Sequence, residues 1–159
     1  MITQVADVNR ATFYAHFSNK QDFIDEMLYE LLAGFEDAIM QPFENKSKIT
    51  INKLTPTTES IFKYIEENKN IFHALSLSHS DFAKHLEKLF HHIFTKNIYI
   101  ETTSKLGEVN YEMFIHYQTN ATLGLIIYWI KSKFIYSKDY MMEQLTILSN
   151  TKTVNLRKI

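Results

Sequence analysis

The sequence predicts an all-helical protein, and three observations carry that prediction. There are only 3 Gly and 2 Pro in 159 residues, too few for the many turns that a β-sandwich or barrel needs. Hydrophobic residues make up 45% of the chain and include 12 Phe and 9 Tyr, enough to fill the core of a domain of this size. Apolar residues also recur at helical spacing along most of the chain.

The first forty residues predict a short helix, a turn and a long helix. The letters "DVN" at 7–9 form a turn in which Asn9 caps a short helix of about 10–17. The letters "SNK" at 18–20 form a second turn and cap. A long helix of about 19–40 follows, and Pro42 ends it. Its apolar stripe consists of Phe23, Met27, Leu28, Leu31, Leu32, Phe35 and Ile39.

The middle of the chain predicts three further helices. Residues 43–54 are polar and form a loop, after which Thr55 and Pro56 start a helix that reaches about Asn68. A short helix of about 69–77 comes next. Ser80 is expected to cap the following helix, whose apolar spacing continues to Ile98, and residues 101–108 form a connection.

The C-terminal third contains the most apolar segment. A helix of about 109–133 is apolar on nearly every side, so nearly every side must be covered. Ser137 caps a final helix that contains Met141, Leu145 and Leu148, and residues 151–159 read as a flexible basic tail. The predicted organisation is therefore 1–40 for the opening helices with the long helix, 41–150 for the bundle and 151–159 for the tail.

Composition narrows the class of protein. The absence of Cys excludes disulfides and thiolate metal sites. A net charge of −1 means that any contact with nucleic acid must use a small local patch. The longest apolar run, "ATLGLIIYWI", is too short to span a bilayer, and no signal peptide is visible. We therefore expect a cytoplasmic protein with no membrane partner.

The stretch "ITQVADVNRATFYAHFSNKQDFIDEML" resembles the DNA-binding motif of the tetracycline-repressor (TetR) family of transcriptional regulators. The stretch "ATLGLIIYWIKSKFIYSKDYMMEQL" is similar to the C-terminal region of the same family. The residues that carry the first resemblance are Ala6, Asp7, Val8, Asn9, Thr12, Phe13, Tyr14, Phe17 and Lys20. The resemblance implies a TetR-like fold, with a partial helix-turn-helix followed by a bundle for effector binding and dimerisation.

The resemblance also implies function. A homodimeric repressor would read operator DNA and would be released by a small organic effector. The residues expected at the DNA are Asn9, Arg10, Ala11, Thr12, Tyr14, His16 and Lys20. The family motif begins with a further helix before "ITQVA", which leaves a second hypothesis: a dimeric ligand-binding or dimerisation protein that has lost DNA binding.

Two further sets of residues are expected to line an effector pocket and a dimer interface. The pocket would use aromatic side chains and one amide from several helices: Tyr64, Phe72, Phe90, Phe94, Phe114, Tyr117 and Gln118. The interface would pair the last two helices with their copies through Leu123, Gly124, Ile127, Ile130, Met141, Leu145 and Leu148.

Other chemistries find little support in the sequence. Seven His occur, but no two are three or four residues apart, so no single helix offers a ligand pair, and a site assembled from distant segments stays open. No phosphate-binding Gly-rich loop, nucleophile elbow or metalloprotease motif occurs. We therefore expect no enzyme activity, no cofactor and no metal.

Overall fold

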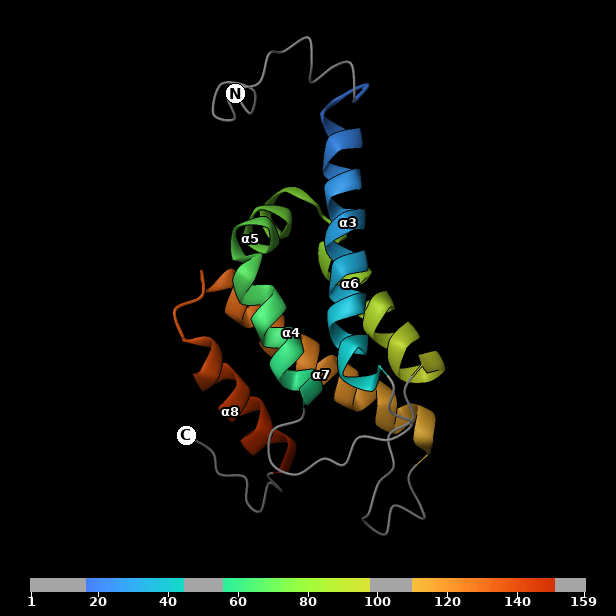
Figure 1. Cartoon of the computed structure of the whole chain (residues 1–159), viewed down its shortest axis with the longest axis vertical. Coiled ribbons are helices and arrows are strands. Elements are labelled where there is room, and N and C mark those ends of the chain that lie inside the picture. The colour runs from blue at the N-terminus through green and yellow to red at the C-terminus, as the bar shows by residue number, and fades with distance from the viewer. Residues whose placement is uncertain (1–16, 45–55, 98–109, 151–159) are drawn as a thin grey trace, which may run out of the picture.

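The structure, a computed structural model, describes residues 17–44, 56–97 and 110–150. Every element within these ranges is helical, which confirms the predicted fold class (Figure 1). The elements are α3 (Lys20–Met40), a 3-10 turn η1 (Gln41–Phe43), α4 (Pro56–Glu67), α5 (Lys69–Ser78), α6 (Phe82–His92), a π-helical turn η2 (Ile93–Asn97), α7 (Tyr111–Lys131) and α8 (Lys138–Asn150).

Helix α3 begins and ends where its sequence predicts. The side chain of Asn19 accepts hydrogen bonds from the backbone N–H groups of Gln21 at 2.7 Å and Asp22 at 3.0 Å. These bonds satisfy donors that the first helical turn leaves free. At the other end, Pro42 lies in the 3-10 turn η1. The predicted short helix of about 10–17 falls on residues of which all but Phe17 lie outside the described ranges.

The middle helices agree with the predicted positions, with one correction at α6. Helix α4 begins at Pro56, and α5 covers Lys69–Ser78. Ser80 does not cap α6, because the residue before this helix is Asp81, and no side chain forms a cap bond there. The helix also changes register after His92, where the π-helical turn η2 replaces α-helical bonding.

Side chains cap the starts of the last two helices, and the sequence predicts one of the two caps. Asn110 accepts a hydrogen bond from the backbone N–H of Met113 at 3.2 Å at the start of α7. Ser137 accepts one from Tyr140 at 3.2 Å, as predicted for the start of α8. Helix α7 is two residues shorter at each end than expected, which is within the usual uncertainty of helix ends.

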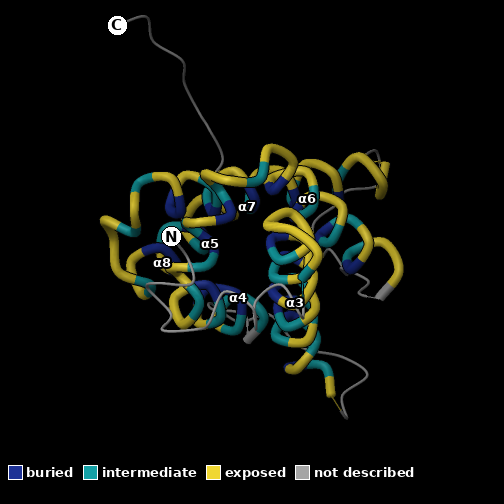
Figure 2. Tube along the Cα trace, turned by 90° about the horizontal axis from the view of Figure 1, so that it is seen from above, coloured by how far each residue is buried: buried dark blue, intermediate teal, exposed yellow. Residues whose placement is uncertain are grey.

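One core joins the helices. Helix α3 packs on α4, α6 packs on α7, and α4 also contacts α8. Buried positions follow the inner sides of the helices, and exposed positions follow the outer sides (Figure 2). The largest fully buried side chains include Trp129, Phe35, Phe62, Phe72, Phe82 and Phe90. The N-terminal end of α3 projects past the other described helices (Figure 1).

Candidate functional site

Of the residues expected to contact DNA, the structure describes one, Lys20, at the start of α3. Lys20 is exposed and is the first residue of the helix. The ring of Phe17 lies edge-on to that of Phe23, with 5.0 Å between their centroids. Lys20 therefore stands at a helix end where the side chain of Asn19 already accepts hydrogen bonds from the backbone N–H groups of Gln21 and Asp22. The other expected DNA contacts, namely Asn9, Arg10, Ala11, Thr12, Tyr14 and His16, lie outside the described residues.

Three of the expected pocket residues meet around Phe35 of α3. The centroid of the Phe35 ring lies 5.6 Å from that of Tyr64, 5.6 Å from that of Phe72 and 5.7 Å from that of Phe90. We call these four residues the ring cluster. Phe94 extends it, because its ring centroid lies 5.9 Å from that of Phe90. The cluster joins α3, α4, α5 and α6.

Tyr64 is held in the ring cluster by its polar end. Its hydroxyl donates a hydrogen bond to the carbonyl oxygen of Leu31 on α3 at 3.1 Å. Burial, and secondarily the charge of Asp37, raises the pKa of this hydroxyl above its ordinary value. Tyr64 can lie so close to α3 because residue 34 is Gly. A Cβ at Gly34 would collide with the hydroxyl oxygen of Tyr64 and would lie 3.1 Å from its Cζ atom.

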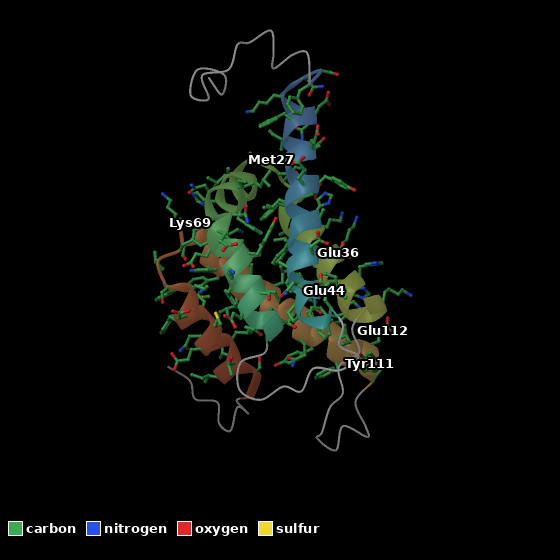
Figure 3. The ribbon with its side chains drawn as sticks, in the orientation of Figure 1. Met27, Glu36, Glu44, Lys69, Tyr111 and Glu112 are labelled. Atoms are coloured by element: carbon green, nitrogen blue, oxygen red, sulfur yellow. The ribbon has the colours of Figure 1, made fainter. Side chains whose placement is uncertain are left out.

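The remaining expected pocket residues do not join the cluster. Tyr117 is 71% exposed, and Phe114 and Gln118 are half-buried. Phe72 and Phe90 are completely buried among neighbouring rings. An effector would therefore have to separate rings that now touch. A shallow depression elsewhere, lined by Asp37, Ala38, Met40, Gln41 and Glu44, contains none of the expected residues. Glu44 marks its position at the end of η1 (Figure 3).

The structure buries most of the residues expected at the dimer interface within a single subunit. Leu123, Ile130, Met141 and Leu145 are 7%, 0%, 2% and 9% exposed, and all four belong to the core of the subunit. Ile127 is half-buried against the same core. These side chains already cover one another within one chain, which leaves little of their surface for a contact with a second. Of the expected set, Gly124 and Leu148 remain outside, and a Cβ at Gly124 would meet no atom within 4 Å.

A different apolar surface lies on α7, α8 and the loop between them. Its members are exposed and mostly aromatic, and we call them the outer row: Tyr117, Gly124, Tyr128, Tyr136, Tyr140, Ile147 and Leu148. The ring of Tyr136 lies 6.5 Å from that of Tyr128 and stacks at 4.9 Å on that of Tyr140. These contacts connect the row across the loop. A hydrogen bond with Tyr136 is the main cause that raises the pKa of the Tyr128 hydroxyl.

The loop between α7 and α8 fixes the position of Tyr136. Lys133 and Phe134 both have a φ of 57°, in the left-handed region that side chains seldom adopt. The indole N–H of Trp129 donates to the carbonyl oxygen of Tyr136 at 2.9 Å. The ring of Phe134 lies edge-on to the indole at 5.0 Å. A buried tryptophan therefore holds the turn that joins the two parts of the outer row.

Neither a metal-binding cluster of three or more ligands nor a membrane-spanning helix occurs among the described residues. Among the residues that the structure describes, no three His, Cys, Asp or Glu side chains gather as metal ligands. None of the described helices combines the length and apolar character needed to span a bilayer.

Comparison with known proteins identifies the family. Residues 52–151 match the family model of a TetR-type "Transcriptional regulator C-terminal region". The chain is also 18% identical over 152 residues to the HTH-type transcriptional regulator YxbF of Bacillus subtilis (strain 168), a match that covers 95% of this chain. The match covers 39% of that relative, so the chain spans about two fifths of its length. The chain belongs to the TetR family of transcriptional regulators.

Proposed function

We propose that this chain is a DNA-binding repressor that acts as a homodimer and is released by a small organic effector. The single observation that supports this most is the course of α3. One uninterrupted helix carries the exposed Lys20 at its capped start and Phe35 of the ring cluster near its other end. At 1.5 Å per residue its 21 residues span about 30 Å. A small tilt at the ring cluster is therefore magnified at Lys20.

The effector would act by separating rings. Phe90 of α6 and Phe72 of α5 both contact Phe35, so a molecule placed between them would move α3 relative to α5 and α6. The effector must bind the separated arrangement better than the closed one, since only that difference in affinity can shift the population. A flat aromatic or aliphatic molecule would replace the lost ring contacts.

The dimer would form through the outer row. The exposed rings of Tyr128, Tyr136 and Tyr140 form a connected surface that a second copy can cover, and Leu148 is exposed on the same helix as Tyr140. Gly124 has no side chain and open space before it, so a partner helix can approach the backbone of α7 closely. A symmetric contact between two copies would also hold two DNA-reading stretches at a fixed separation, as paired operator half-sites require.

DNA binding tests the central claim. We expect fluorescence anisotropy to show that this chain binds a fragment of the DNA upstream of its own gene. The affinity should exceed that for an unrelated fragment roughly a thousandfold or more at physiological salt. Equal affinity for both fragments, or none, together with a stable dimer would instead favour the second hypothesis, a dimeric ligand-binding protein that does not read DNA.

The dimer has its own test. Tyr128→Asp places a charge in the outer row, where a partner would bury it at a cost of several kcal/mol. Tyr29→Asp is the matched control, because Tyr29 is 74% exposed on α3, away from the outer row. Light scattering should give a dimer for the parent chain and for Tyr29→Asp and a monomer for Tyr128→Asp. A parent chain that is monomeric at micromolar concentration would refute the interface.

A further inference from the structure

Two histidines meet between α6 and α7. The Nε2 atoms of His91, on the last turn of α6, and of His116, on α7, lie 3.1 Å apart, and their ring centroids lie 4.5 Å apart. His91 is half-buried and His116 is exposed, so solvent and ions can reach the pair. The two residues are 25 positions apart in the sequence and are brought together by the packing of α6 on α7.

We propose that His91 and His116 bind a transition-metal ion such as Zn²⁺ or Ni²⁺ that links α6 to α7. Imidazole nitrogen is a preferred ligand of both ions. A metal about 2.05 Å from both Nε2 atoms at the observed separation would see them at an angle of roughly 98°. That angle lies between the angles of about 90° and about 109° that octahedral and tetrahedral coordination require. The separation of the two nitrogens therefore suits either geometry once the rings turn toward a common metal position.

Metal binding requires one proton of the histidine pair to change its position. As the pair stands, one Nε2 donates a hydrogen bond and the other accepts it. For a metal to bind, that proton must move to the Nδ1 atom of the same ring, which leaves a lone pair on each Nε2. Neither ring is fully buried, so water can satisfy the new N–H group. The other coordination positions are open to water or to a chelating molecule.

The surroundings favour a cation. Glu87 lies four residues before His91, and Glu112 lies four residues before His116, so each imidazole has a carboxylate one helical turn away. These two negative charges outweigh that of Lys88 on the same turn of α6. Glu112 and Tyr111 mark the start of α7 in Figure 3, where this helix runs beside the end of α6.

The backbone at His91 also departs from regular helix. The π-helical turn η2 begins two residues later, and the hydroxyl of Thr95 donates to the carbonyl oxygen of His91 at 2.6 Å. Such turns occur frequently at functional sites. Phe90, the residue before His91, touches Phe35 of α3. The metal, or a molecule that chelates it, would therefore act next to the ring cluster. This regulatory role rests on the proposed function, whereas metal binding itself does not.

The test is thermal denaturation of this chain, treated with a chelator and then titrated with ZnCl₂ or NiCl₂. We expect the metal to raise the Tm of the parent chain. His91→Gln and His116→Gln keep a polar side chain but lose the ligand, so each should weaken the apparent affinity roughly tenfold or more. His92→Gln is the matched control, because His92 is the adjacent exposed imidazole and should bind no metal with His116.

Calorimetry then measures the stoichiometry, which should be one ion per chain. An unchanged Tm of the parent chain, or equal rises in all three variants, would overturn the site. Failure of the chain to bind DNA would refute the proposed function and leave the metal result standing.

Discussion

The contact between Gly34 and Tyr64 fixes α3 against α4, and Gly34→Ala tests it. In the interior of a helix this change normally stabilises by about 1 kcal/mol. Here the added Cβ would collide with the Tyr64 hydroxyl. The ring cannot swing aside freely, because it stacks on Phe35 at 5.6 Å and meets Phe72 edge-on at 6.2 Å.

The expected cost can be worked from these contacts. Displacing Tyr64 loses its hydrogen bond to the Leu31 carbonyl, worth about 1 kcal/mol. It also strains the packing around the ring, which costs about 1–3 kcal/mol. After subtracting the helix-propensity gain, Gly34→Ala should lower the free energy of unfolding by about 1–3 kcal/mol. The Tm should fall by about 2–4 °C for each kcal/mol.

A double-mutant cycle separates the two effects. In a Tyr64→Ala background nothing obstructs the new methyl group, so Gly34→Ala should stabilise by about 1 kcal/mol. Urea denaturation of the parent chain, both single variants and the double variant gives the four values. The reasoning is refuted if Gly34→Ala stabilises the parent chain as much as it stabilises the Tyr64→Ala background.

Three other predictions follow from single side chains. Lys20→Ala should weaken binding to all DNA sequences alike and reduce the slope of log affinity against log salt by about one, and an unchanged slope would contradict a phosphate contact. Because folding raises the pKa of Tyr64, the contribution of its hydroxyl to stability is complete below about pH 10 and is lost as the pH rises through the folded pKa. Urea denaturation above pH 10 should therefore show a smaller loss of unfolding free energy for Tyr64→Phe than for the parent chain. Trp129→Phe removes the bond to the Tyr136 carbonyl and should cost about 1–3 kcal/mol in the same assay, and a loss near zero would show that the loop does not depend on the indole.

Helix positions followed from the sequence because local chemistry determines them. Asn19 and Ser137 cap α3 and α8 through bonds to residues at most three positions away, and Pro56 starts α4. Such signals need no knowledge of the fold. Ser80 failed as the cap of α6 because several polar residues precede that helix, and spacing alone does not choose among them.

The sides of α7 could not be assigned in the same way. A helix that is apolar nearly all round gives no internal sign of which side faces the core. Leu123 and Gly124 are neighbours, yet the first is buried in the subunit and the second faces open space. Packing against α6 and α8 decides the rotation of the helix. The His91–His116 pair could not be predicted from His spacing within one helix, because its two residues lie on different helices and meet only through packing.

These assignments give α7 three different sides. Ile126 and Ile130 face the core, Gly124 and Tyr128 belong to the outer row, and His116 meets α6. The core side of α7 is fixed by its packing within the subunit, and the proposed dimer would cover its outer side. The ring cluster, by contrast, consists of residues from α3, α4, α5 and α6 and includes none from α7. Under the proposed function, a molecule that separates these rings would move α3 relative to α5 and α6, and the histidine pair lies where α6 packs on α7.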